Sequence, residues 1–334
     1  MEDFELFINR FIGVSIETLL QALKNSPGAN ASIIGAVSEL LLKQHLEEAG
    51  FEVLRIKEKP AGGNKAKNIN ARGDFYIKKK GSDKDEWLIV ESKGLKSNSE
   101  FRGAKLDGKV KLFKFLKRLV FTDEETRQKQ YDKGKRTYQT EKLKWVEEHP
   151  GETFPPFTWK VETAGPGNAF LSGLWKDEQE LKEWIEQQDP EIFTEKAYRN
   201  CEGAIIVLET HQPSKRVGTI TGLTKTAPLV TDFNIMAVDL FFRTRKHEFV
   251  FMNPQHISHS PDSPEHLYQN YTIDILVKGK KTEPVIRPPW YRDVDELIRD
   301  TKPTPRALDE TQLDTRQGYS LSLGELPLDE NTDG

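Results

Sequence analysis

Two short apolar runs, residues 72–77 (RGDFYI) and 87–93 (WLIVESK), decide the fold of this 334-residue chain. Both contain aromatic and β-branched residues, and the polar run between them, KKGSDKD at 79–85, is typical of a tight turn. Together they predict a β-hairpin with strands at 74–78 and 86–91. A helix predicted at 35–49 and a short strand at 51–56 come before this hairpin, since Gly50 is a typical helix-terminating residue.

The charged residues at the ends of the two hairpin strands are predicted to converge. Alternate residues of a strand share a face, so Glu91 and Lys93 point the same way at the tip of the second strand. Folding the hairpin about Ser82 and Asp83 pairs residues whose numbers sum to 165, which sets Asp74 opposite Glu91. Directly opposed side chains have Cβ atoms about 4.5–5.5 Å apart. Two carboxylates this close repel unless a cation lies between them, and a few hard oxygen ligands favour Mg²⁺.

The pattern Asp/Glu-x-Lys has little weight by itself, because 31% of the residues are charged and it occurs four times. The occurrences begin at Glu91, Asp107, Glu180 and Asp300. Only the first ends an apolar strand and has an acid in register on a preceding strand. The alternative interpretation of Glu91 and Lys93 is a surface ion pair at a strand end.

Asp74, sixteen intervening residues and then Glu91-Ser92-Lys93 resemble the motif of the PD-(D/E)xK nuclease superfamily, which has the restriction-endonuclease-like fold. The chain departs from the family pattern at Gly73, because a proline usually precedes the first acid. The resemblance implies metal-dependent hydrolysis of phosphodiester bonds, with Asp74 and Glu91 holding Mg²⁺. It implies that Lys93 orients the attacking water or steadies the charge developing on the phosphate. The backbone carbonyl of Ser92 is implied as a further metal ligand.

The resemblance covers residues 35–95, and in this family the preceding helix often supplies one more acid. Glu39 fits that role as a catalytic and metal-binding residue. On a helical wheel it lies beside Leu42, Leu46 and Ala49, on a stripe that we expect to face the sheet. An acid in that position needs a partner, which a metal site provides. The alternative is an exposed glutamate at the edge of the stripe.

The implied fold class is α/β: a restriction-endonuclease-like central mixed sheet flanked by helices, with a helical insertion and an additional β-rich second half. Residues 1–34 are expected to form an N-terminal helical segment, which contains a helix at 3–23. The nuclease domain is expected to span 35–302, with a basic helical insertion at about 100–200, and 303–334 to form an acidic, flexible tail. Strand-like runs in the second half lie at 203–209, 237–243, 248–252 and 272–277.

Composition and local charge narrow the classes of function. The single cysteine, Cys201, excludes a disulfide framework and a cysteine-based zinc site. The longest apolar runs are too short to span a bilayer, and the acidic N-terminus does not resemble a signal peptide, so we expect a cytoplasmic protein without membrane contacts. The net charge is −4, yet residues 93–144 hold sixteen Lys or Arg against seven Asp or Glu. This segment, with its local excess of nine positive charges, could contact the phosphate backbone of a nucleic acid.

The basic residues expected to contact DNA lie on two predicted helices. Lys111, Lys114 and Arg118 fall within a narrow arc of a helix at 108–121, opposite its leucines. Farther on, Lys135 and Arg136 lie between Tyr131 and Tyr138, and this mixture of aromatic and basic groups suits contacts to a DNA backbone. The alternative is a helical face whose charges serve only solvation.

These features predict a Mg²⁺-dependent, site-specific endonuclease for double-stranded DNA, of the type II restriction kind and acting as a homodimer. The length beyond a minimal nuclease core is what sequence recognition and dimerisation require. Two alternatives stay open. One is another PD-(D/E)xK nuclease, in repair, transposition or phage defence, and the other is a nucleic-acid-binding module without catalysis.

Overall fold

The computed structural model of the chain describes most of the predicted core. The described residues are 2–57, 73–94, 108–121, 124–164, 175–194, 208–211, 215–244, 246–268, 270–273, 286 and 288–314. Cys201 and most of the strand predicted at 203–209 lie outside these ranges, as does the side chain of Arg118.

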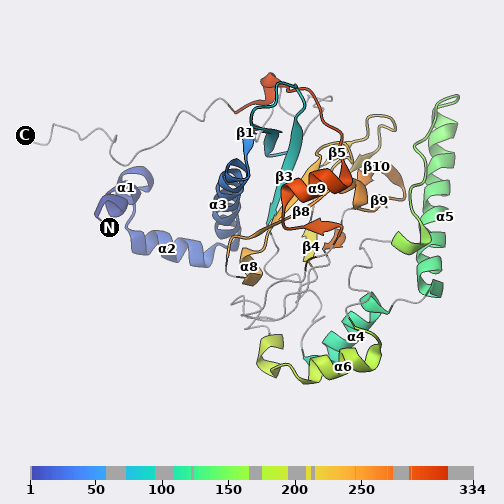
Figure 1. Ribbon diagram of the computed structural model, residues 1–334, viewed down its shortest axis with the longest axis horizontal. Helices are drawn as coiled ribbons and strands as arrows, with labels where there is room; N and C mark the ends of the chain where they lie inside the picture. Colours follow the sequence, from blue (N-terminus) through green and yellow to red (C-terminus); the bar gives the residue numbers. More distant parts are fainter. Residues whose placement is uncertain are drawn as a thin grey trace, which may run out of the picture.

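Within the described residues, six strands form the central sheet, in the order β1-β2-β3-β7-β8-β12. Their bounds are β1 Phe51–Arg55, β2 Phe75–Lys79, β3 Leu88–Gly94, β7 Ile235–Asp239, β8 Phe249–Met252 and β12 Trp290–Tyr291. Strands β3 and β7 pair in parallel, whereas the other neighbours in the sheet are antiparallel. The sheet is therefore mixed, and helices flank it (Figure 1).

The register predicted for the β2–β3 hairpin is confirmed. Its three pairs are Phe75 with Val90, Tyr76 with Ile89, and Ile77 with Leu88. The numbers in each pair sum to 165, as predicted. The ladder ends one pair short of Asp74, whose backbone amide instead donates to the Val90 carbonyl over 2.8 Å.

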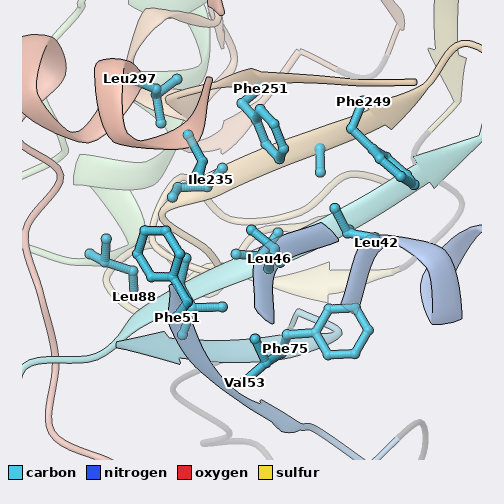
Figure 2. Packing of buried hydrophobic residues seen from close by; sticks show 14 residues of the cluster. Leu42, Leu46, Phe51, Val53, Phe75, Leu88, Ile235, Phe249, Phe251 and Leu297 are labelled. Atoms are coloured by element: carbon cyan, nitrogen blue, oxygen red, sulfur yellow. The ribbon is translucent and has the colours of Figure 1, made fainter. Parts of the chain in front are cut away.

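Helices α3 (Pro27–Glu48) and α9 (Val294–Thr301) cover one face of the sheet. Leu42 and Leu46 of α3 are fully buried there against apolar residues of the strands, and Leu297 of α9 joins the same cluster (Figure 2). Alternation along the strands produces this packing. Phe75, Leu88 and Val90 face the helices, while their neighbours Tyr76 and Ile89 face a second core on the other side.

The N-terminal helices differ from the prediction. The single helix expected at 3–23 is two helices, α1 (Glu2–Ile12) and α2 (Ile16–Asn25). The break follows from Gly13, which has a φ of +76°, and from Ser15, whose side chain caps α2. Helix α3 begins at Pro27, so it runs across the predicted boundary at residues 34 and 35.

The insertion contains α4 (Lys109–Val120), α5 (Glu124–Glu148) and α6 (Glu178–Glu186). Helices α4 and α6 lie side by side, and α5 lies across the sheet from α3 in the view of Figure 1. The short 3₁₀ helices are η3 Val161–Thr163, η5 Pro190–Phe193, η6 Pro254–His256 and η7 Glu310–Gln312.

Three small two-stranded ribbons account for the remaining described strands. They are β4 (Leu208–His211) with β11 (Asn270–Ile273), β5 (Arg216–Val217) with β6 (Thr224–Lys225), and β9 (His259–Ser260) with β10 (Ser263–Leu267). The strand predicted at 237–243 was placed too far along the chain. β7 ends at Asp239, whose carboxylate accepts the Phe241 amide at 2.9 Å, and the short helix α8 (Phe241–Thr244) follows.

The first part of the predicted acidic tail packs against the sheet. Trp87 and Arg306 exchange two backbone hydrogen bonds of 2.8 Å, and the Asp314 amide donates to the carbonyl of Arg55 over 2.9 Å. Gln312 and Asp314 are buried. Residues 303–314 thus close the region around β1 and the start of β3, and residues 315–334 lie outside the described part of the chain. Among the described helices, none is long and apolar enough to cross a membrane.

Candidate active site

The predicted pair Glu91 and Lys93 lies at the end of β3, on one face of the strand. The Lys93 ammonium donates to a carboxylate oxygen of Glu91, and the two side chains are only 21% and 17% exposed. Parallel pairing with β7 sets the apolar residues Met236 and Val238 beside them. The ion pair therefore lies in largely apolar surroundings, in contrast to the exposed strand-end pair that was the alternative.

Asp74 reaches the same place from the residue before β2. Its Oδ2 accepts the backbone amide of Ser92 at 2.6 Å, so the carboxylate is held against β3 between Glu91 and Lys93 along the chain. Gly73 makes this approach possible. A Cβ at Gly73 would lie 2.4 Å from the Ile89 side chain and 2.8 Å from the Val90 carbonyl oxygen. A glycine here lets the chain lie directly on β3.

The electrostatics of this cluster are those of crowded, desolvated charges. Burial raises the pKa of Asp74 to about 6, a shift that Lys93 opposes and that Glu39 adds to. Burial likewise raises the pKa of Glu91 to about 7, against the effect of Lys93 and with that of Asp74. Burial alone would lower the pKa of Lys93, but the two carboxylates outweigh it and raise that pKa. Lys93 is therefore a cation, while its neighbours are acids with weakened ionisation.

Glu39 of α3 forms an ion pair with a basic residue of β1. Its carboxylate accepts a hydrogen bond from the Arg55 guanidinium at 3.0 Å, and the two side chains are 28% and 35% exposed. Its charge still raises the pKa of Asp74, so it lies within electrostatic reach. Arg55 was missed in the sequence analysis. Alternation along β1 places Arg55 on the same face as Phe51 and Val53, the face that α3 covers. This alternation is the sequence signal that could have identified Arg55 as a partner of α3.

The donor set fits a Mg²⁺ ion that keeps several non-protein ligands. Within the described ranges, no group of three or more His, Cys, Asp or Glu side chains could hold a metal ion. Asp74 and Glu91 supply two carboxylates, and Mg²⁺ is commonly bound by one or two carboxylates together with water and substrate phosphate. A divalent cation would also stabilise the ionised forms of both carboxylates, against the burial that raises their pKa values. Ser92, whose carbonyl was the further predicted ligand, lies between Glu91 and Lys93 on β3 and is in register with Ala237 of β7.

A further titratable pair lies at the same end of the sheet. Asp239 is in register with Gly94, one residue beyond Lys93, and is only 3% exposed. Its Oδ2 is hydrogen-bonded to Nδ1 of His247 at 2.7 Å, and the His247 ring stacks on Phe241 with 4.3 Å between centroids. The sequence analysis did not single out this pair, because eight residues separate its members and no motif joins them.

The other described Asp/Glu-x-Lys patterns occupy different surroundings. Glu180 lies on α6 and Asp300 on α9, both near the solvent, while Asp107 falls outside the described residues. Among the described occurrences, Glu91-Ser92-Lys93 is therefore the one on a strand of the sheet.

The predicted DNA-binding residues lie on the insertion. Lys111 and Lys114 are exposed on α4, and Arg118 is on the same helix. Lys135 and Arg136 are exposed on α5. Other charges of α4 are engaged by α6, because the ammonium of Lys117 lies 2.6 Å from the Glu178 carboxylate and that of Lys109 lies 3.6 Å from Glu186.

Comparison with known proteins yields no relative: no family model, no curated protein and no solved structure matches the chain.

Proposed function

We propose that the protein is a Mg²⁺-dependent endonuclease that cuts double-stranded DNA at specific sites, in the manner of type II restriction enzymes. The single observation that carries this proposal is the cluster of Asp74, Glu91 and Lys93, held together at one end of β3. Perturbed titratable groups with specific charge partners are typical of active sites. The mixed sheet flanked by helices is also what a restriction-endonuclease-like fold would provide.

The roles of the residues follow from their surroundings. Bound Mg²⁺ would supply Lewis acidity at the scissile phosphate and lower the pKa of a coordinated water. Asp74 and Glu91 would hold the ion, and the hydrogen bond from the Ser92 amide fixes the direction of the Asp74 carboxylate. The raised pKa of Lys93 favours a cationic role, so this residue would steady the negative charge of the phosphate rather than remove a proton.

Site specificity and a dimeric state belong to the same proposal. Sequence recognition requires donors and acceptors presented to base edges from elements held rigidly relative to the scissile bond. The insertion α4–α6 and the ribbons after residue 208 are elements beyond the central sheet that could provide them. Two-fold symmetry would match a palindromic site and bring one Asp74/Glu91/Lys93 cluster to each strand.

The proposal is tested by digestion of a long duplex DNA with the purified protein in Mg²⁺. Asp74→Ala and Glu91→Ala should each lower cleavage by several orders of magnitude, about 4 kcal/mol or more of transition-state stabilisation. The matched control is Glu180→Ala, which removes the acid of another Asp/Glu-x-Lys pattern and should cut normally. Circular dichroism on each variant separates loss of chemistry from loss of folding.

The products decide between the alternatives. Discrete fragments with defined ends, together with a dimer in sedimentation on DNA, support the restriction activity. A smear with random ends would replace it by a nuclease without fixed sequence. Normal cleavage by either purified variant would reject the active site. Absence of cleavage with intact DNA binding would leave a binding module that retains the fold.

A further inference from the structure

A pocket of about 520 Å³ lies between α5 and the segments around β6 and β9–β10, and none of the candidate active-site residues lines it. Four segments that are distant in sequence form its wall: α5, Trp159, the stretch that includes β6, and the β9–β10 ribbon with the residues after it. The residues that line it include Lys133, Thr137, Trp159, Lys225, Asp262 and Tyr268. Its volume is in the range of pockets that bind small organic ligands.

The aromatic side of the pocket is built on a helical glycine. Gly134 is buried in the middle of α5, and a Cβ there would lie 2.6 Å from the Trp159 ring. Glycine in a helix interior is unfavourable by about 1 kcal/mol relative to alanine, but here it allows the indole to lie directly on the helix. The indole N–H donates to the His259 carbonyl at 2.7 Å, and the ring centroid of Tyr268 is 5.9 Å away. Both aromatic rings are thus held in place while only partly buried.

The polar side of the pocket carries both signs of charge. The Asp262 carboxylate accepts hydrogen bonds from the Lys225 ammonium and from the Ser260 hydroxyl. Lys225 and Asp262 remain 33% and 29% exposed, so both can meet a ligand. Lys133 and Thr137 line the pocket from α5 and are exposed.

The part of α5 that borders the pocket carries an excess of positive charge. Residues 127–136 of this helix contain five Lys or Arg and a single acid. A phosphate-bearing ligand is therefore attracted to this side of the protein. Aromatic rings, cations and an anchored carboxylate together match the three parts of a nucleotide: a base face, a phosphate, and exocyclic amino groups that donate hydrogen bonds.

We infer that this pocket binds a single nucleotide, with its base against Trp159 and Tyr268, its phosphate near Lys133 and Lys225, and Asp262 accepting from the base. The nucleotide can come from two sources, a base turned out of a DNA duplex or a free mononucleotide. Only the first source rests on the proposed function, because it takes DNA as the partner. Turning a base out of the stack requires a few kcal/mol, which a shaped aromatic pocket can offset.

The first experiment measures binding of each deoxynucleoside monophosphate to the full-length protein by calorimetry, without Mg²⁺. Trp159→Leu should weaken binding at least about tenfold, since stacking on an aromatic ring contributes about 1–3 kcal/mol per base. Trp159 also supports the fold, so two variants of exposed α5 residues accompany it. Thr137→Trp fills the pocket and should abolish binding, and Lys133→Ala should weaken it several-fold. Lys144→Ala, farther along α5, is the matched control and should bind normally.

The second experiment uses duplexes that carry 2-aminopurine at successive positions, bound in Ca²⁺. Emission that changes at one position with the normal protein, and not with Thr137→Trp, identifies a base from DNA. Binding of free mononucleotides in the first experiment, without a signal in the second, would support the pocket as a site for a free nucleotide. No signal in either experiment, or signals that Thr137→Trp leaves unchanged, would overturn the inference. Failure of the proposed function would appear elsewhere, as absence of cleavage, because neither experiment requires turnover.

Discussion

Lys93–Glu91 at the end of β3 and Lys117–Glu178 between α4 and α6 join the same kinds of group in different surroundings. The side chains of the first pair are 21% and 17% exposed, and those of the second are 45% and 49% exposed. An exposed pair adds little to stability, because water already solvates both charges. A desolvated pair with a second carboxylate beside it is expensive to keep. The charged side chains of the insertion therefore lose little solvation free energy on folding, whereas those of the cluster on the sheet lose much.

Removal of the cation from each pair should separate the two regions most strongly. Lys93→Met removes the cation that most stabilises the ionised forms of Asp74 and Glu91, so we expect a loss of about 3 kcal/mol in the free energy of unfolding at pH 8. Lys117→Met is the control and should change it by less than about 0.5 kcal/mol. Urea denaturation measures both. Equal, small losses would mean that the β3 pair is as well solvated as the helical pair.

A methyl group at Gly73 tests how closely the acid-bearing loop lies on β3. Gly73→Ala would push a Cβ into the Ile89 side chain and the Val90 carbonyl, with an expected loss of about 2–3 kcal/mol and a displaced Asp74. Gly35→Ala on α3 is the matched control, since no atom lies within 4 Å of its added Cβ. This control should be neutral or stabilising by up to about 1 kcal/mol. Thermal unfolding of the two variants gives the comparison, and a neutral Gly73→Ala would contradict the close approach.

The pH dependence of stability should come from the sheet cluster. The folded-state pKa values of Asp74 and Glu91, about 6 and about 7, lie above the ordinary values of 3.8 and 4.5. The folded protein therefore binds more protons than the unfolded chain in this window, and the stabilisation present below about pH 4 is lost as the pH rises through 6–7. We expect the free energy of unfolding of the unaltered protein to fall between pH 5 and pH 8, measured in EDTA. This fall should exceed that of the Glu91→Gln variant by about 1–2 kcal/mol. Parallel curves for the two proteins would refute the shift.

The insertion should respond to salt rather than to pH. Reversal of the exposed residues Lys111 and Lys114 to Glu should weaken DNA binding in Ca²⁺ and make the slope of log K against log[salt] shallower. The expected change is about 0.9 per lost phosphate contact. Lys84→Glu, in the turn before β3, is the control and should keep the slope. An unchanged slope in the α4 variant would mean that the charges of this helix serve only solvation and do not contact DNA.

Features that depend on local alternation were predictable from the sequence, and features that depend on distant partners were not. The pairing of Tyr76 with Ile89 and the shared face of Glu91 and Lys93 follow from strand geometry and a short turn. The apolar run of β7 predicted a strand, but its parallel pairing with β3 left no local signal, because such a run can pair with either edge of the hairpin. The strand pattern places Arg55 on the face that α3 covers, but no local pattern links it to Glu39 in particular, since the two residues lie on different elements.

The tail shows a different limit of sequence reasoning. Its acidic, proline-containing composition predicted flexibility, yet residues 303–314 form backbone hydrogen bonds with Trp87, Arg55 and Lys57. Backbone donors and acceptors are the same for every residue type except proline, so composition does not reveal such pairing.

The parallel pairing of β3 with β7 also sets an order of events during synthesis. The 140 residues 95–234 separate the two strands, so at usual rates of translation β7 emerges roughly 7–28 s after β3. During that interval the β1–β3 meander can form, but the free edge of β3 has no neighbour. An unpaired strand edge invites association between nascent chains, and charged side chains at its end discourage it. Glu91 and Lys93 therefore place charge at the end of β3 during the interval in which its partner strand is missing.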